Sequence, residues 1–347
     1  MFKLKKQGNG PIFQPDSKLK WENEGVFNPG IVKLGKEIVM LYRAVGEKHS
    51  YISHLGLAKS RDGHHFTRCS TKPIFGPSHN FDKWGVEDPR ITKIGSYFYI
   101  TYVAVSKRIM KDGQAISYSP PLETAVALLR TKNFSSYENI GVISPKKSDN
   151  KDTVLFPKKI KGRYCLLHRP NHWTKEWFAG SYEKYVHDDI PCSKNNLPKF
   201  SSIWIAWSDD LKKWDDHHLL FEPSQEKGIK IGPGLPPIET KDGWLIIYHH
   251  VEKDSRTKKL IYSVRVALLD LKNPEKIISQ LPYDILQPKK TYETESNTSV
   301  VFPTGGFVSK KNILYVYYGA ADRYVCLATG PLDKLLLEFK KPANKKT

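Results

Sequence analysis

The chain has 347 residues and a formal net charge of +19 at pH 7, and 39% of its residues are hydrophobic. This composition fits a folded protein with a sizeable core and argues against an intrinsically disordered chain. The N-terminal residues lack the apolar stretch of a signal peptide, and no apolar run approaches the ~20 residues that a membrane span needs. We therefore expect a soluble, cytoplasmic protein with no membrane partner.

The excess of positive charge makes nucleic acid the first partner to consider, because phosphate backbones attract lysine and arginine. The lysines are scattered along the chain, and no helix-turn-helix, zinc-finger or RNP-like segment accompanies them. We therefore predict no nucleic-acid partner and interpret the charge as a solvated surface that attracts anionic substrates. The four cysteines lack metal-ligand spacing and are interpreted as buried or incidental thiols. The sequence implies neither a metal nor an organic cofactor.

A pattern of two strands recurs five times, at intervals of about 60 to 80 residues. Each unit opens with a strand rich in aromatic and β-branched residues, and a strand of small apolar residues follows. Turn signals such as Lys33-Leu-Gly-Lys and Lys241-Asp-Gly precede the opening strands, as hairpins require. The opening strands are predicted at 38–43, 97–103, 163–169, 244–249 and 314–318, and the second strands at 54–58, 124–129, 203–207, 264–269 and 325–328.

The predicted helix content is one short helix near residues 331–339. Five β-meander units without amphipathic helices between them favour radial repetition, which predicts an all-β, five-bladed β-propeller forming a single domain over residues 1–347. A pair of β-sandwiches is the competing interpretation, because strand counts alone do not separate the two. Residues 171–200 are predicted to be an insertion between strands of the third unit, serving as a lid, an oligomer contact or a plain surface loop.

The opening strands carry polar residues where a propeller would bring them together. In that fold the first strand of each blade lines a central channel, so matching positions should converge there. Aromatic rings stack on sugar faces and cations bind phosphate oxygens, so a mixture of the two with carboxylates suits sugar-phosphate chemistry. The candidates are Arg43, Arg169 and His249 at strand ends, Asp322 beyond the last strand, and Asp88 in Glu87-Asp-Pro-Arg90 just before the second.

Each candidate also has a plainer interpretation. Asp88-Pro89 would serve as a turn starter or helix cap. Arg43 and Arg169 would be ion-pair residues that close a blade, and His249 would be a hydrogen-bonded core histidine. Lys230 would normally lie on the surface, but it sits in a Gly/Pro-rich loop of the kind that lets a backbone approach a ligand closely. Joint placement on equivalent strands is what favours a site.

Several motifs together resemble glycoside hydrolase family 130, the β-mannoside phosphorylases and their hydrolytic relatives. Members of that family are five-bladed propellers, which agrees with the repeat. The resemblance covers about residues 27–328 and rests on Trp84-Gly-Val-Glu-Asp-Pro-Arg-Ile-Thr, Val154-Leu-Phe-Pro, His168-Arg-Pro, Ile203-Trp-Ile-Ala-Trp-Ser-Asp-Asp-Leu, Lys230-Ile-Gly, Gly243-Trp-Leu-Ile-Ile-Tyr-His and Tyr317-Tyr-Gly-Ala-Ala-Asp.

The resemblance implies a role for each candidate residue. Asp88 matches the catalytic acid, which is thought to protonate the glycosidic oxygen through the mannose 3-hydroxyl. The mannose-binding positions fall on Asn28, Arg43 and Asp322, with Arg90 as a further substrate-binding candidate, and the phosphate-binding positions fall on Lys151, Arg169, Lys230 and Tyr262, with His249 beside them.

Two residues depart from the family pattern. Lys151 stands where an arginine is common, which keeps the charge but loses the planar fork of a guanidinium. His250 replaces the usual glycine after Tyr-His, and we expect its side chain to crowd the pocket.

Phosphorolysis and hydrolysis need different residues. An inverting hydrolase needs an acid and an opposed carboxylate base, ~6.5–9.5 Å apart, to activate water. A phosphorylase needs the acid and a cationic clamp, because phosphate is already anionic. Lys151, Arg169 and Lys230 therefore favour an inverting phosphorolysis in which inorganic phosphate is the co-substrate and α-mannose 1-phosphate the product.

The linkage is harder to assign from the sequence. Glu24-Gly-Val-Phe-Asn-Pro-Gly, combined with the motif around Asp88, is most similar to members that act on β-1,2-mannobiose or β-1,2-oligomannan. Three alternatives stay open: a β-1,4-mannosyl-glucose or mannosyl-N-acetylglucosamine phosphorylase, a β-mannosidase that uses water, and a non-catalytic mannoside-binding propeller. A homo-oligomer is compatible with all of them.

Overall fold

The computed structural model describes residues 1–46, 51–106, 109–111, 114–117, 124–145, 149–175, 190–223, 228–295 and 298–341. Regular structure in these residues is almost all β-strand, arranged mainly as antiparallel sheets of consecutive strands. No helix in this part of the chain is long and apolar enough to cross a membrane.

Three four-stranded antiparallel sheets follow one another along the chain. Their strands are β2 (Gly25–Leu34), β3 (Glu37–Val45), β4 (Ser53–Ser60) and β5 (Thr67–Arg68) in the first sheet, β6 (Val86–Ile94), β7 (Tyr97–Val105), β10 (Thr124–Thr131) and β11 (Glu138–Val142) in the second, and β12 (Asn150–Leu155), β13 (Tyr164–Pro170), β14 (Ile203–Ser208) and β15 (Asp215–Phe221) in the third. Strands β8 (Ile109–Lys111) and β9 (Gln114–Ser117) form a separate hairpin.

The remaining strands form a nine-stranded sheet made of two groups. A short parallel pairing of β19 with β21 joins the groups. The first group contains β16 (Gly228–Pro233), β17 (Ile238–Thr240), β18 (Gly243–Lys253), β19 (Leu260–Leu269) and β20 (Ile277–Gln280), and the second contains β21 (Ser299–Val308), β22 (Ile313–Ala320), β23 (Tyr324–Pro331) and the N-terminal β1 (Lys5–Lys6). Short 3-10 turns lie at Lys194–Asn196 and Thr291–Glu293, and the predicted C-terminal helix is present as α2 (Leu332–Glu338).

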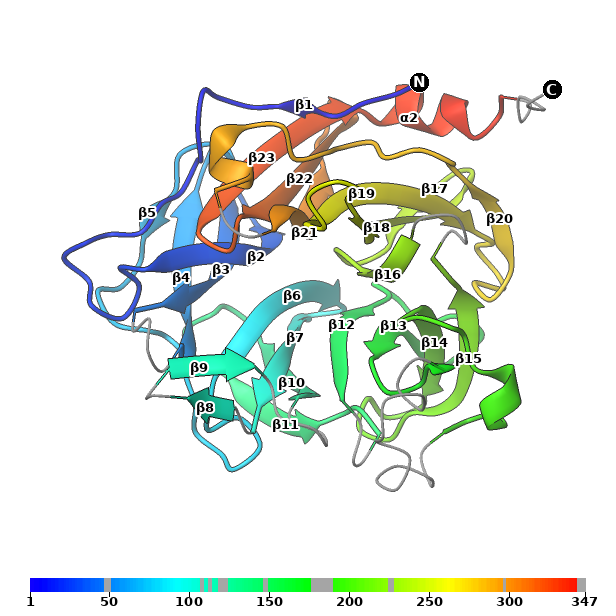
Figure 1. The fold of residues 1–347 in the computed structure, drawn as a ribbon, viewed down its shortest axis with the longest axis horizontal. Coiled ribbons are helices and arrows are strands. Elements are labelled where there is room, and N and C mark those ends of the chain that lie inside the picture. Colours follow the sequence, from blue (N-terminus) through cyan, green and yellow to red (C-terminus); the bar gives the residue numbers. More distant parts are fainter. Residues whose placement is uncertain are drawn as a thin grey trace.

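The first strand of each group, β2, β6, β12, β16 or β21, lies nearest the middle of the molecule (Figure 1). These inner strands contact one another: β2 touches β6 and β21, β6 touches β12, and β12 touches β16. The strands predicted to open each unit are present, but their predicted order is wrong. They are the second strands of their groups, namely β3, β7, β13, β18 and β22. The inner strands escaped detection because proline, glycine and polar residues interrupt their apolar pattern, as Asn28-Pro-Gly does in β2.

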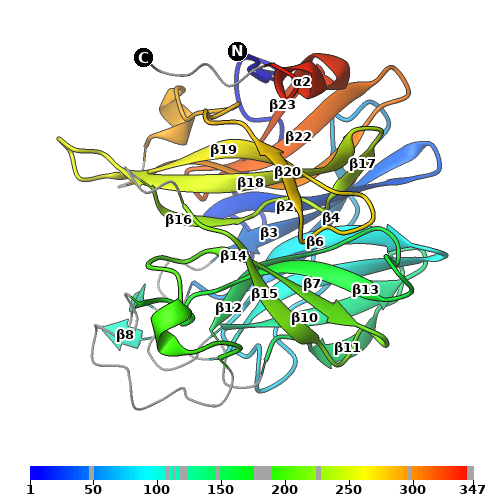
Figure 2. The same cartoon turned by 90° about the vertical axis from the view of Figure 1, so that its right-hand side faces the viewer.

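Apolar side chains pack in the spaces between neighbouring sheets. Leu41 of β3 packs with Ile91 and Ile100 of the second sheet, and Val154 of the third sheet packs with Ile246 of β18. The N-terminal segment and α2 lie side by side next to β23 (Figure 2). Strand β1 pairs with the far edge of β23, so the beginning and the end of the chain meet in one sheet.

A buried carboxylate secures this junction. Glu293 is fully buried, and it accepts hydrogen bonds from the Tyr318 hydroxyl (2.9 Å) and from the backbone N–H groups of Lys289 (2.7 Å) and Lys290 (2.9 Å). Lys6 of β1 completes the set by an ion pair to the same carboxylate. Glu293 thus ties the N-terminal strand to the turn before β21.

We expect Glu293→Gln to lower the free energy of unfolding by about 1–3 kcal/mol, because an amide nitrogen cannot accept the bonds that one carboxylate oxygen now accepts. Denaturant unfolding measures this. The control is Glu37→Gln, which removes the half-exposed Lys59–Glu37 pair and should lower the unfolding free energy by less than about 1 kcal/mol. Equal losses in the two variants would contradict the role given to Glu293.

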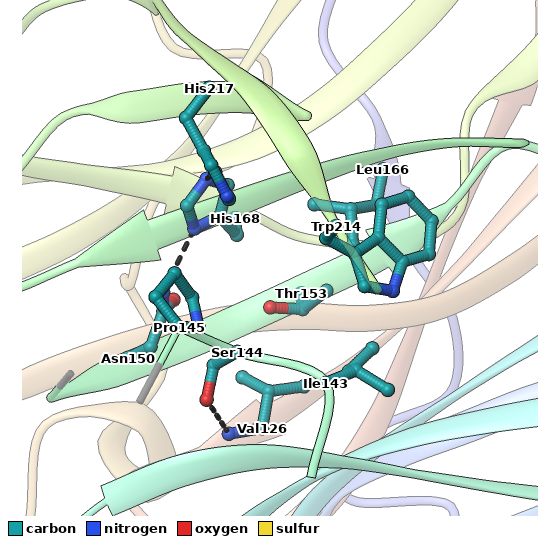
Figure 3. Close-up of a pocket in the computed structure, with 10 residues that line it drawn as sticks. All are labelled: Val126, Ile143, Ser144, Pro145, Asn150, Thr153, Leu166, His168, Trp214 and His217. Atoms are coloured by element: carbon teal, nitrogen blue, oxygen red, sulfur yellow. Dashed lines mark hydrogen bonds between the residues drawn. The ribbon is translucent and has the colours of Figure 1, made fainter. Parts of the chain in front are cut away.

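A small cavity of about 10 Å³ lies between the second and third sheets (Figure 3). Asn150 Nδ2 lies 2.9 Å from His168 Nδ1, and His168 Nε2 lies 3.1 Å from His217 Nδ1. Because an amide NH₂ can only donate, we assign the His168 proton to Nε2, which donates to His217. Both imidazoles are neutral in this arrangement. The cavity is too small for a sugar, and its lining residues are Val126, Ile143, Ser144, Pro145, Asn150, Thr153, Leu166, His168, Trp214 and His217.

This histidine pair should make the fold sensitive to acid. Burial lowers the pKa of His217 to about 4 and that of His168 well below its usual range. Below the unfolded-state pKa of about 6.5, the unfolded chain therefore binds protons that the folded chain does not, and stability falls as the pH drops toward 4. For His217 alone we expect about 2 kcal/mol less unfolding free energy at pH 5 than at pH 7.

The measurement is the unfolding free energy of the protein and of His217→Gln across this pH range. The glutamine oxygen can accept the same hydrogen bond from His168 but does not titrate, so the pH dependence should become shallower. The neighbouring exposed His218→Gln is the matched control and should leave the slope nearly unchanged. An unchanged slope in His217→Gln would show that this pair does not set the acid sensitivity.

Candidate active site

A second cavity, of about 280 Å³, is lined by residues from every strand group. Nine of the ten predicted site residues line it, and the tenth, Arg90, lies behind its wall. The complete lining is Asn28, Arg43, Glu87, Asp88, Lys151, Asp152, Arg169, Lys230, His249, Tyr262, Thr298, Val300, Phe302 and Asp322.

Each inner strand has a register shift, or β-bulge, near the cavity, and three of these bulges share a further feature. These three lie in β2, β6 and β12, and each contains a residue in the left-handed region: Asn28 (φ 47°), Asp88 (φ 50°) and Asp152 (φ 53°). Asn and Asp tolerate this conformation better than other non-glycine residues, and a bulge changes the direction of a side chain. Asp88-Pro89 is therefore part of strand β6, and the turn-starter interpretation does not hold.

Asp88 belongs to a cluster of hydrogen bonds on one side of the cavity. Its Oδ1 accepts hydrogen bonds from Asn28 Nδ2 (2.8 Å) and from Arg43 Nη1 (3.2 Å). Arg43 Nη2 also donates to Glu87 Oε1 (2.7 Å), and Lys151 Nζ lies 3.8 Å from Glu87 Oε2. Arg43 thus forms ion pairs and also lines the cavity, so the two interpretations of this residue are compatible.

Asp322 lies on the same side, in the turn between β22 and β23. Its side chain is exposed to the cavity, but protein atoms surround it closely and exclude part of the water around its carboxyl group. This partial loss of water raises its pKa, and the charges of Asp88 and Glu87 act in the same direction against the opposing charge of Arg43.

Cations gather on the other side of the cavity. Lys230 Nζ donates to the Tyr262 hydroxyl (2.8 Å), so this lysine is held at the cavity and not extended on the surface. His249 packs beside Tyr262 and Phe302, whose ring centroids lie 6.0 and 4.7 Å from its own. Burial holds the pKa of His249 well below its usual range, and the charges of Arg169 and Lys230 act in the same direction. His249 is therefore neutral.

Neither ring nitrogen of His249 makes a hydrogen bond to a described residue, so it is not the hydrogen-bonded core histidine of the plainer interpretation. Gly232 provides the room for this ring. A Cβ there would come within 2.4 Å of His249 Cε1 and 2.6 Å of Asp152 Oδ2.

Asp152 is a site residue that the sequence motifs did not reveal. Its Oδ2 accepts a hydrogen bond from Arg169 Nε (2.6 Å), and its Oδ1 accepts one from Arg90 Nη2 (3.1 Å). Burial alone would raise its pKa, but the charges of Arg169 and Arg90 and the hydrogen bond from Arg169 outweigh burial and hold the pKa well below its usual range. The available signal was its position in β12, which matches those of Asn28 and Asp88 in their strands. Glu87 and Phe302 were also missed.

Arg90 connects three segments of the inner wall. Its Nε donates to Gly234 O (2.9 Å), its Nη1 to Asp88 O (2.9 Å) and its Nη2 to Asp152, and only 1% of the residue is exposed. This position does not suit direct contact with a substrate, and it suits a residue that holds the inner strands together.

His250 does not crowd the cavity as expected. Successive side chains of a strand point to opposite faces, and His250 lies 3.5 Å from Glu252 Oε1 and 4.0 Å from Asp284 Oδ1, away from the cavity lining.

The predicted insertion is described at 171–175 and 190–200. Trp173 and Leu197 pack against Trp204 of the third sheet there. Residues 176–189, on which the predicted lid or oligomer contact depends, lie outside the described residues.

The arrangement combines a carboxyl group held by hydrogen-bond donors with a separate group of cations in one cavity. Such a cavity can bind a polar substrate on one side and an anion such as phosphate on the other. Among the residues that the structure describes, no group of three or more His, Cys, Asp or Glu side chains is placed to hold a metal ion.

Comparison with known proteins places these features in a class of phosphate-using enzymes. The family model for glycoside hydrolase family 130, described as beta-1,4-mannooligosaccharide phosphorylase, matches residues 5–341. The chain therefore belongs to glycoside hydrolase family 130.

Two curated relatives match nearly the whole chain. The chain is 33% identical to the 1,2-beta-oligomannan phosphorylase of Thermoanaerobacter sp. (strain X514), a match that covers 94% of this chain and 97% of the relative. It is 31% identical to the beta-1,2-mannobiose phosphorylase of the same organism, over 96% and 99% of the two chains. The structure of beta-1,2-mannobiose phosphorylase from Listeria innocua, in complex with beta-1,2-mannobiose, superposes with a TM-score of 0.76 at 25% identity, over 97% of this chain and 99% of that one.

Proposed function

We propose that this protein is an inverting phosphorylase of β-mannosides, which transfers a non-reducing-end mannosyl unit to inorganic phosphate and releases α-mannose 1-phosphate. The observation that carries the proposal is the division of the charged cavity. Asp88 stands with Asn28 and Arg43 on one side, Arg169 and Lys230 line the other, and Lys151, 3.8 Å from Glu87, adds a third cation. A sugar and a phosphate can therefore meet in one cavity.

The fold that we infer for this enzyme is a five-bladed β-propeller. Five strand groups, each with its first strand innermost, support it, as does the contact of neighbouring inner strands. In this architecture β1 is the outermost strand of the last blade. Its pairing with β23 joins the N-terminal segment to the last blade and covers an edge that would otherwise be unpaired.

In the proposed reaction, Asn28, Arg43 and Asp322 hold the mannosyl unit, and Asp88 in its protonated form supplies the proton that the leaving oxygen needs. Following the family resemblance, that proton passes through the mannose 3-hydroxyl. Phosphate attacks the anomeric carbon from the opposite face as the bond to the acceptor breaks. The acceptor leaves with a hydroxyl group, and the proton that the new phosphate ester gives up restores Asp88.

The cationic side supplies electrostatic stabilisation, and the carboxylates that contact its cations are poorly suited to activate water. Lys151, Arg169 and Lys230 can neutralise the phosphate charge in the transition state. The carboxylates beside them are poor general bases, because Glu87 is paired with Arg43 and Lys151, and Asp152 with Arg90 and Arg169. This favours phosphorolysis over the β-mannosidase reaction.

For the linkage, we propose β-1,2-mannobiose or β-1,2-oligomannan as the substrate, because the two relatives with at least 31% identity reported above bear those names. The description of the family model names a β-1,4-linked substrate instead, so the assay has to include both linkages.

We expect the purified protein to form mannose 1-phosphate from β-1,2-mannobiose only when inorganic phosphate is present, because phosphate is the attacking group. Mannose 1-phosphate and free mannose are measured separately, with and without phosphate, for β-1,2- and β-1,4-linked substrates. Equal release of mannose without phosphate would make the protein a hydrolase. Binding without any product would instead indicate a mannoside-binding protein.

Variants on the two sides of the cavity should differ in their kinetics. Asp88→Asn should fold, since Asn28 adopts a similar φ in its own bulge, and should lower kcat by about 10²–10⁴-fold because the acid is lost. Lys230→Ala should instead raise the KM for phosphate by about tenfold or more, because a charge-assisted bond is lost. Steady-state kinetics with each substrate varied in turn measures both effects. Full activity of Asp88→Asn would rule out its assigned role.

A further inference from the structure

The carboxylate of Asp152 connects Arg169, a candidate phosphate ligand, to the segment that carries Asp88. We propose that Asp152 is a positioning residue for phosphorolysis: it fixes the guanidinium of Arg169 for phosphate and ties it, through Arg90, to the backbone of Asp88. This inference rests on the proposed function, which assigns Arg169 to phosphate, and it gives a task to a residue that the proposed reaction leaves without one.

Two hydrogen bonds fix the plane of the Arg169 guanidinium. Its Nε donates to Asp152 Oδ2 (2.6 Å), and its Nη1 donates to Asn171 Oδ1. A guanidinium has five N–H groups in a rigid plane, so these two bonds leave the donors of Nη2 available. Arg169 is 5% exposed and lines the cavity. A planar fork held from two directions in this way is preorganised for an anion with several oxygens.

Asn171 is itself held in place. Its Nδ2 donates to Asp149 Oδ2 (3.1 Å), and its backbone N–H donates to Asp149 O (2.8 Å). Arg169 is thus supported by a buried carboxylate on one side and by a fixed amide on the other.

The second oxygen of Asp152 is connected to Asp88 through Arg90. Its Oδ1 accepts a hydrogen bond from Arg90 Nη2 (3.1 Å), while Arg90 Nη1 donates to the carbonyl oxygen of Asp88 (2.9 Å). Arg169 and Asp88 are therefore connected by a continuous set of side-chain contacts through Asp152 and Arg90. In the proposed reaction these are the groups that must sit on opposite sides of one anomeric carbon, and small displacements in such geometry reduce rates strongly.

A purely structural role is the competing explanation, because Asp152 also neutralises the fully buried Arg90, and breaking a buried ion pair is destabilising. The two explanations differ in what they predict for phosphate. A structural role lowers stability alone. A positioning role changes the use of phosphate more than that of the mannoside, and it acts through Arg169.

The test compares Asp152→Asn, Arg169→Gln and the double variant. Asparagine suits the φ of 53° at this bulge, as Asn28 shows in β2, and it removes the charge at nearly constant size. We expect Asp152→Asn to raise the KM for phosphate by about tenfold or more, while the KM for β-1,2-mannobiose changes by less than about twofold. In the Arg169→Gln background, Asp152→Asn should add less than about twofold, because residues that act as one unit are not additive.

Asp82→Asn is the matched control. Asp82 is fully buried, accepts hydrogen bonds from Tyr102 and two backbone N–H groups, and does not line the cavity. Its replacement should lower the melting temperature without changing the KM for phosphate. If Asp152→Asn does not fold, Asn171→Ala tests the same idea from the other support of Arg169, and it should raise the KM for phosphate several-fold.

Stabilisation of the protein by inorganic phosphate in thermal unfolding separates this inference from the proposed function. If the unmodified protein makes no mannose 1-phosphate, but phosphate raises its melting temperature and does not raise that of Asp152→Asn, the reaction is wrong and the positioning role stands. If the protein is active and Asp152→Asn leaves the KM for phosphate unchanged, the positioning role is overturned alone. If phosphate neither reacts nor stabilises the unmodified protein, both are overturned.

Discussion

A buried guanidinium holds together the strands from which the site is built. Arg90 donates to the backbone at Asp88 and Gly234 and to the side chain of Asp152, so a single residue connects β6, β12 and the segment after β16. Isolating a charge from water is costly unless it is fully paired. Arg90 meets this condition with two carbonyl groups and a carboxylate, and the requirement for all three partners fixes how the inner strands lie relative to one another.

The bulges explain why this arrangement places the proposed catalytic and binding groups at the cavity. A regular strand would direct alternate side chains to its two faces. The extra residue at each bulge breaks that alternation, so Asn28, Asp88 and Asp152 line the cavity together with their neighbours Glu87 and Lys151. The resulting crowding of charge is tolerated because Glu87 and Asp152 each have two cationic partners. Most of the other lysines in the described part of the chain are exposed.

Much of the site could be predicted from the sequence, because it depends on short motifs. The motifs around Asp88, Arg169, Lys230 and His249 identified the family and nine residues of the cavity. The recurrence of paired strands was also correct, as was the short C-terminal helix.

The position of each strand within its sheet could not be predicted. The innermost strands carry the prolines, bulges and polar residues of the site, and these features remove the alternating pattern by which strands are recognised. For the same reason Asp152 went undetected, since its importance comes from contacts with Arg90 and Arg169 that no local pattern records. The direction of His250 likewise depended on the strand register.

The pairing of β1 with β23 also affects when the protein can fold during its synthesis on the ribosome. The cavity takes residues from Asn28 in β2 to Asp322 near the C-terminus, and the sheet that supports Asp322 is completed by Lys5 and Lys6. Contacts between such distant parts of a chain form late, because the intervening loop must first be closed. Lys5 and Lys6 therefore cannot pair with β23 until residues 324–331 have been synthesised, and the cavity has its full lining only once Asp322 has emerged.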